Sequence, residues 1–159
     1  MIRCATTIAA VLVTLPAWAG DFVGPAAFKD ADSPWMDGRE LRIANGLDAI
    51  ELTQVCTKDG APWFAGQDAA AAVRAMFAGK TMICADTGDR SYGRPLVTCT
   101  VDGQDVAAAI IRAGWGMDWE KYSAGSLREA QAEAKAAGRG IWAGECLEPW
   151  VWRKAAWGK

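Results

Sequence analysis

The chain has 159 residues, a length that favours one domain with a single hydrophobic core. Its net charge is −2 at pH 7, and an acidic domain of this kind is not steered to polyanions by its overall field, so a nucleic-acid partner would require a local basic groove or a bound cation. Histidine is absent, which excludes Ser-His-Asp and Cys-His catalysis and makes a transition-metal site improbable.

Residues 1–19 are typical of a secretory signal peptide. Arg3 precedes an apolar run over residues 8–15, and the small-x-small triplet at residues 17–19 predicts cleavage after Ala19. A membrane anchor is the alternative, but the run is shorter than the roughly 20 residues that cross a bilayer. We therefore expect a periplasmic or secreted protein without a membrane anchor, with one domain over residues 20–159 and its core at about 28–153.

The rest of the chain divides into short strands and alanine-rich helices. Strands are expected between Gly20 and Leu52, with Asp37-Gly38 as a hairpin turn. The patterns then predict a helix over 66–80, strands over 80–86 and 95–101, a helix over 104–115, and a helix that begins at the S-x-x-E capping box of residues 126–129 and ends near Gly138.

This order of elements predicts the fold class. About three strands, a helix, two strands and two helices favour an α+β domain, mainly β, over a parallel sheet, which would alternate strands with helices. The best match is a five-stranded OB-fold barrel with about three flanking helices.

Five cysteines divide into one in the leader, Cys4, and four in the expected domain. No CxxC pair exists and histidine is absent, so disulfides are favoured over a metal site in an exported protein. Cys84 and Cys99 are the preferred first pair, because two strand-like segments would place them side by side, and Cys56 with Cys146 follows by elimination. Four cysteines allow three pairings in all.

Acidic and basic residues gather in a few segments that could form one site. They are Asp30, Asp32, Arg42, Asp48, Glu51 and Arg94. Carboxylates can hold a hard cation such as calcium and activate water, and guanidinium groups can clamp phosphate. Each segment alone has an ordinary alternative, because acidic residues beside Ser, Pro and Gly usually cap turns and a strand arginine is commonly solvated or ion-paired.

Six short segments or residues occur along the chain in an order that is typical of one protein family. They are "DADS" (30–33), Arg42, "GLDAIE" (46–51), "DRSYGR" (89–94), "IIRAGW" (110–115) and "GRGIW" (138–142). From about Phe28 to Arg153 the chain thus resembles the staphylococcal nuclease-like, or thermonuclease, family. The segment "EPWVWR" (148–153) also resembles the tail of exported bacterial members.

The resemblance implies a calcium-dependent nuclease that acts as a monomer on single-stranded or denatured DNA or on RNA. Asp32 and Asp48 would hold the calcium ion together with the backbone carbonyl of Ala49, and Asp30 would lie just behind them. Glu51 would be the general base for the attacking water.

The resemblance also implies the residues that bind the substrate. Arg42 and Arg94 would bind the scissile phosphate and stabilise the charge of the transition state. Tyr92 would hydrogen-bond phosphate, and Trp119 or Tyr122 would stack a base.

Departures from the family pattern keep a second interpretation open. Ala31, Ser33 and Ile50 replace the usual glycine, threonine and proline, and one residue is added both between Arg42 and Asp48 and within "DRSYGR". An insertion in a strand turns side chains to the opposite face unless a bulge absorbs it. If Arg42 pointed away, the chain would be a catalytically inactive OB-fold module that binds nucleic acid or an envelope protein.

Overall fold

A computed structural model describes residues 21–158, and the expected signal peptide with Cys4 lies outside this range. The strands are β1 (Phe22–Pro25), β2 (Ala27–Phe28), β3 (Pro34–Met36), β4 (Arg39–Glu40), β5 (Arg42–Ile43), β6 (Leu47–Ala49), β7 (Cys56–Lys58), β8 (Ala61–Trp63), β9 (Thr81–Ser91), β10 (Arg94–Val101), β11 (Gln104–Asp105) and β12 (Gly116–Asp118). The helices are α1 (Ala65–Phe77), α2 (Val106–Arg112), α3 (Glu120–Ser123), α4 (Arg128–Ala136), the short 3-10 helix η1 (Gly140–Ala143) and α5 (Pro149–Trp157).

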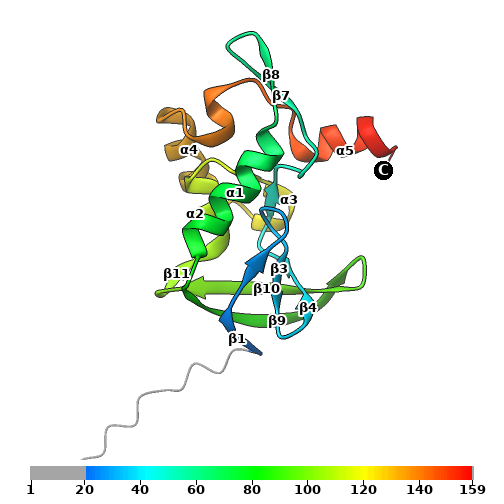
Figure 1. The fold of residues 1–159 in the computed structure, drawn as a ribbon. Helices are drawn as coiled ribbons and strands as arrows, with labels where there is room; N and C mark the ends of the chain where they lie inside the picture. The colour runs from blue at the N-terminus through cyan, green and yellow to red at the C-terminus, as the bar shows by residue number, and fades with distance from the viewer. Residues whose placement is uncertain (1–20, 159) are drawn as a thin grey trace, which may run out of the picture.

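The largest sheet is built around the long hairpin of β9 and β10 (Figure 1). Its order is β1-β9-β10-β11 with antiparallel pairing, and the short strand β5 adds to β10 in parallel. Cys84 lies directly opposite Cys99 in this hairpin, and the two form a disulfide. The second disulfide joins Cys56 to Cys146, so both bridges follow the pairing that the sequence favoured.

The mixed α+β class, mainly β, is confirmed, but the details differ from the expectation. Within residues 21–158 the strands form one five-stranded sheet and three smaller sheets, and their pairing does not close into a single barrel. Five α-helices are present there instead of about three. The additional two are the one-turn α3 and the C-terminal α5, which lie outside the three helices that the sequence predicted.

Local turn signals were correct at the hairpins and wrong at one helix start. Asp37-Gly38 connects β3 to β4, with positive φ at both residues, as predicted. The capping box was wrong, because α4 begins at Arg128 without a side-chain cap. Ser126 instead donates its backbone N–H to the Ser123 carbonyl, in a tight turn that leads into the helix.

Helix α1 packs its alanine-rich face into the core and so fixes the loop that follows β6. Ala65, Ala69, Val73 and Phe77 are buried at a spacing of four residues, one stripe of the helix. At the start of the helix a Cβ on Gly66 would lie 1.9 Å from the Glu51 carbonyl oxygen, so only glycine allows this approach. The backbone of Glu51 is therefore held directly against α1.

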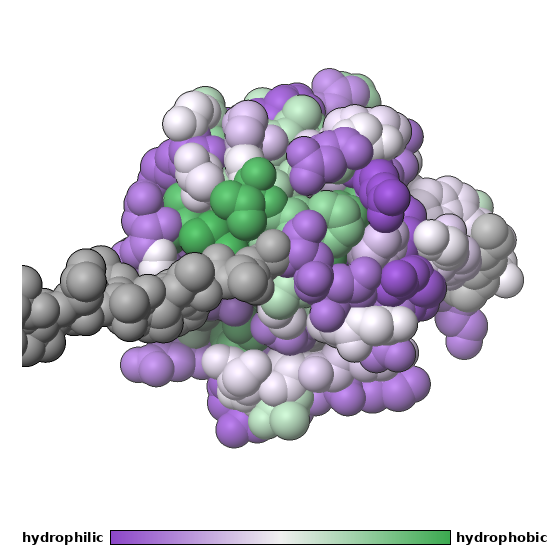
Figure 2. All heavy atoms as spheres, turned by 90° about the horizontal axis from the view of Figure 1, so that it is seen from below, coloured by the Kyte–Doolittle hydropathy of each residue, from purple (hydrophilic) through white to green (hydrophobic). Residues whose placement is uncertain are grey.

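The surface of the sheet and the lengths of the helices complete the description. The face seen from below Figure 1 is mostly hydrophilic and includes an apolar area (Figure 2). The exposed residues in the outer half of β9 are Thr87, Gly88, Asp89 and Arg90, none of which is apolar and bulky. No helix among residues 21–158 combines the length and apolar character needed to cross a bilayer.

Candidate active site

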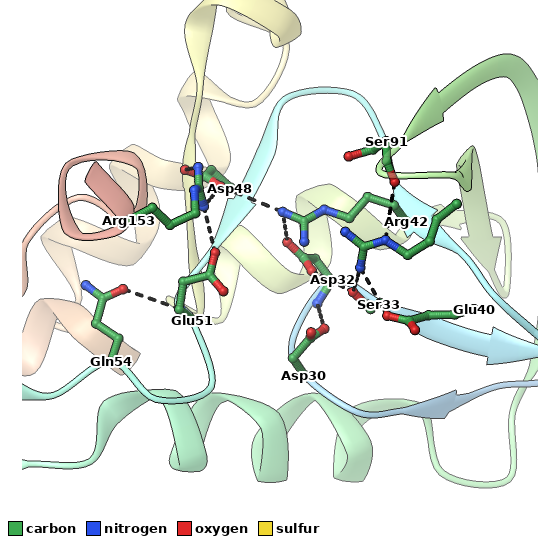
Figure 3. A network of polar contacts seen from close by, with 11 residues as sticks. Asp30, Asp32, Ser33, Glu40, Arg42, Asp48, Glu51, Gln54, Ser91 and Arg153 are labelled. Carbon is green, nitrogen blue, oxygen red and sulfur yellow. Dashed lines mark hydrogen bonds and ion pairs between the residues drawn. The ribbon is translucent and has the colours of Figure 1, made fainter. Parts of the chain in front are cut away.

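Asp32, Arg42 and Asp48 meet in a buried ionic cluster (Figure 3). Asp32 lies in the turn between β2 and β3, and its backbone carbonyl accepts from the Ile43 N–H on β5 at 2.9 Å. This places the Arg42 Nη2 2.6 Å from an Asp32 carboxylate oxygen and 3.9 Å from an Asp48 oxygen. Asp32 is 3% exposed and Asp48 is 1% exposed, so water screens these charges poorly.

Burial raises the pKa of Asp32 to about 7, although the nearby Arg42 guanidinium opposes the shift. The charges of Asp30, Glu51 and Asp48 add to the rise. Arg42 therefore offsets only part of the cost of burying the charged form of Asp32, and a cation bound beside this carboxyl would favour its ionised form.

Asp48 and Glu51 are positioned by β6 and the loop after it. Asp48 pairs with Met117 of β12 in the antiparallel register, and the Ile50 N–H donates to the Trp115 carbonyl at 3.3 Å. At the turn between β5 and β6, a Cβ on Gly46 would lie 2.5 Å from the Ser123 backbone nitrogen, so glycine is required for this close approach.

Gln54 is a buried polar residue that fixes the Glu51 loop, and sequence reasoning missed it. Its Oε1 accepts from the Glu51 N–H at 3.4 Å, and its Nε2 donates to the Leu147 carbonyl at 2.8 Å. Gln54 is 1% exposed, so these bonds satisfy groups that would otherwise be buried without partners. The loop is thus linked to the segment that precedes α5.

Arg94 reaches the cluster from the first residue of β10. Its Nη1 donates to the Ser33 Oγ at 3.0 Å and to the Glu40 Oε1 at 3.1 Å. Ser33 in turn donates its hydroxyl to Asp32 at 3.1 Å. The serine that replaces the family threonine therefore keeps the hydroxyl that joins Arg94 to the carboxylates.

The two added residues do not turn the arginines away from the site. Between Arg42 and Asp48 the chain makes a turn with positive φ at Asn45 and Gly46, outside both strands. In the β9–β10 hairpin the register shifts between Pro95 and Val97, where residues 87–89 of β9 lie opposite Leu96 alone, and this bulge accommodates extra residues. Arg42 consequently faces Asp32 and Asp48.

Arg153 of α5 is the main residue that the sequence did not indicate. Its Nη1 donates to Asp48 and to Glu51, each at 2.8 Å, and its Nη2 donates to the second Asp48 oxygen at 2.9 Å (Figure 3). Burial would lower the pKa of Arg153, but the hydrogen bonds to both carboxylates outweigh it and raise that pKa. The segment "EPWVWR" resembles a tail motif, yet no pattern within it points to these partners.

The remaining predicted residues lie around this cluster. Asp30 accepts from the Asp32 N–H at 3.2 Å, and Ala49 is buried in β6 opposite Gly116. Tyr92 forms the β9–β10 turn and is 85% exposed.

Trp119 and Tyr122 contact each other at the start of α3. Their ring centroids are 4.8 Å apart in an edge-on arrangement, and Tyr122 is exposed. Trp119 also stacks on Trp150 of α5 with centroids 5.6 Å apart, so part of its surface is already covered.

The structure defines a small α+β domain that gathers aspartates, a glutamate and arginines at one place. The staphylococcal nuclease homologue family matches residues 45–144. The succinoglycan biosynthesis protein ExoI of Rhizobium meliloti (strain 1021) is 34% identical over 139 residues, which cover 85% of this chain and 72% of ExoI. The chain belongs to the staphylococcal nuclease homologue family.

Proposed function

We propose that this chain is an exported, calcium-dependent nuclease that hydrolyses phosphodiester bonds of DNA, RNA or both by metal-assisted attack of water. The observation that carries the proposal is the ionic contact of Arg42 with Asp32 and Asp48, beside Glu51. Membership of the nuclease homologue family supports the same chemistry. The proposal includes the five-stranded OB-fold barrel that the sequence predicts as the architecture of this domain.

The residues at the site fit a calcium ion, although the protein supplies few ligands. Asp32 is a buried carboxyl whose pKa is raised to about 7, which indicates that its negative charge lacks full compensation. Among residues 21–158 no three acidic or cysteine side chains are placed to hold a metal ion, so the protein would supply two carboxylates, Asp32 and Asp48, and the Ala49 carbonyl. Bound there, calcium would supply Lewis-acid stabilisation of negative charge on phosphate oxygens.

Two features of Glu51 support its proposed role as a general base. Its side chain is 17% exposed, so water can reach it, and its backbone is fixed by Gln54 and by α1. In the proposed reaction Glu51 accepts a proton from the attacking water as the new P–O bond forms. The bond to the leaving ester oxygen breaks, and this oxygen keeps the bonding electron pair and takes a proton from solvent water.

The two arginines of the sheet would bind the phosphate. Arg42 on β5 contacts Asp32 directly. Arg94 on β10 is linked to Asp32 through the hydroxyl of Ser33. Their planar guanidinium groups match phosphate oxygens and stabilise the extra charge that develops in the transition state. Tyr92 at the β9–β10 turn, together with Trp119 or Tyr122, would contact the rest of a single-stranded substrate.

A catalytically inactive module that binds nucleic acid or an envelope protein is the second candidate. It is favoured by one observation: both oxygens of Asp48 accept hydrogen bonds from Arg153, which occupies a proposed cation ligand. The two candidates differ in a single measurable property, which is turnover.

The test is hydrolysis of denatured DNA and of RNA by the chain beginning at Gly20, with calcium and with excess chelator. Cleavage that requires calcium, and that is lost in Glu51→Gln and Arg94→Ala, supports the nuclease. Matched controls are Glu129→Gln on α4 and Arg112→Ala on α2, both at exposed positions outside the site. Folded, oxidised protein that binds single-stranded DNA but cleaves neither substrate would instead support the binding module.

A further inference from the structure

The C-terminal helix α5 is attached to the domain by few contacts. Pro149 is the only buried residue of the helix, whereas Val151 is 40% exposed and Trp157 is 48% exposed. Figure 1 shows α5 extending away from the sheets toward the C-terminal end of the described chain. A helix with so little buried surface depends on its few specific contacts to stay in place.

Two of these contacts are made by side chains one turn apart on the same helix face. Trp150 stacks on Trp119, with 23° between the ring planes, and the Arg153 guanidinium lies 5.7 Å from the centroid of the same Trp119 ring. Arg153 then reaches past this ring to Asp48 and Glu51. The helix is thus held by an aromatic stack and by an ion pair with the proposed catalytic carboxylates.

Arg153 takes the positions on these carboxylates that a divalent cation would use. Both Asp48 oxygens and the Glu51 Oε1 accept from this one guanidinium, whose side chain is only 18% exposed. A guanidinium and a divalent cation at the same buried carboxylates repel each other, and the low exposure leaves little water to screen that repulsion.

We propose that Arg153 is a tethered competitor of the metal ion, so that α5 is an autoinhibitory arm over the site. The inference rests on the proposed function, because it takes Asp48 as a calcium ligand. When calcium binds, Arg153 releases Asp48 and Glu51. Withdrawal of the arm also separates Trp150 from Trp119, which frees that ring for a nucleotide base. Cation binding and base stacking are therefore coupled through one helix.

The test is the calcium affinity of the chain beginning at Gly20, measured by titration calorimetry without substrate. Arg153→Gln removes the competing charge, and we expect it to tighten calcium binding by about tenfold or more. Lys154→Gln is the matched control, because it removes one positive charge from the next residue of the same helix, where the side chain is exposed, and we expect less than about a twofold change.

Trp150→Ala provides a second variant that keeps Arg153 but loosens the arm. It should also tighten calcium binding, and terbium luminescence excited through tryptophan should follow the same order of affinities as calcium. Near-ultraviolet circular dichroism verifies that each variant is folded.

The outcomes separate this inference from the proposed function. If wild type, Arg153→Gln and Lys154→Gln bind calcium with equal affinity, or if Arg153→Gln binds it more weakly, α5 is not an autoinhibitory arm. The nuclease proposal then still stands. No calcium binding by any folded variant overturns both the arm and the calcium requirement of the proposed function.

Discussion

The Arg42 guanidinium lies 2.6 Å from the Asp32 carboxylate although the two residues belong to different elements, a strand and the turn before β3. Asp32 is buried and Arg42 is partly buried, and desolvation raises the pKa of Asp32 to about 7 in spite of the nearby guanidinium. One arginine thus compensates only part of the cost of burying this carboxylate among Asp30, Glu51 and Asp48. The site therefore contributes less to the stability of the fold than apolar residues in its place would, as is common where a ligand supplies charge.

The first prediction concerns the pH dependence of stability without metal. Native Asp32 keeps its proton up to about pH 7, whereas the unfolded carboxyl loses it near 3.8, so the native state binds more protons in this window. The contribution of Asp32 to the free energy of unfolding should therefore fall as pH rises from about 4 to 7, by up to about 4 kcal/mol. Asp32→Asn should flatten this slope.

Denaturant unfolding in the presence of a chelator, at several pH values, measures the free energy of unfolding of wild type and of Asp32→Asn. Asp105→Asn is unsuitable as a control because Asp105 caps α2, so Asp89→Asn at an exposed position of β9 serves instead. If the free energy of unfolding had the same pH dependence in wild type and Asp32→Asn, the raised pKa of native Asp32 would be contradicted.

The second prediction concerns the two arginines that bracket the β9–β10 turn. Arg94 contacts Ser33 and Glu40 at the site, whereas Arg90 pairs with Asp86 on the sheet surface. Arg94→Lys should lower kcat/KM for denatured DNA by about 10²-fold, because lysine lacks the planar fork. Arg90→Lys should leave kcat/KM nearly unchanged.

Both variants should remain within about 1 kcal/mol of wild type in unfolding free energy, since both ion pairs are partly exposed. Equal losses of activity in the two variants would show that Arg94 has no special role.

The third prediction concerns the contact between α1 and the Glu51 loop. Gly66→Ala places a Cβ 1.9 Å from the Glu51 carbonyl oxygen, so the backbone has to move. We expect a loss of about 1–3 kcal/mol in unfolding free energy and a loss of nuclease activity that exceeds the loss of folded protein. Gln67→Ala, the next and exposed residue of α1, is the control. Gly66→Ala with wild-type stability and activity would mean that the loop tolerates displacement.

The fourth prediction compares the two disulfides. Cys56–Cys146 closes a loop with a sequence separation of 90, against 15 for Cys84–Cys99. Replacing both cysteines of the longer loop by serine should cost about 1.5 kcal/mol more than the same change in the shorter loop, because the unfolded chain regains more freedom. Thermal and urea unfolding of the two double variants measure the difference. A larger cost for the Cys84–Cys99 pair would indicate that strand packing outweighs loop entropy.

Local chemistry in the sequence was sufficient for much of this protein. Turn residues predicted the Asp37-Gly38 hairpin, the high helix propensity of an alanine-rich segment predicted α1, and the ordered acidic and basic segments predicted which side chains meet around Asp32. These signals depend on neighbouring residues or on spacing along the chain, so they can be read without knowing the fold.

Only the tertiary structure decided how distant segments complete the site. The position of Arg42 depends on where an added residue is absorbed, and a turn at Asn45-Gly46 settles it. The bond from Gln54 to Leu147 and the bonds from Arg153 to Asp48 and Glu51 join segments about 100 residues apart, so no local pattern encodes them. Among residues 21–158 the strand pairing also does not form the closed barrel that the sequence predicted, because pairing depends on contacts between segments far apart in the chain.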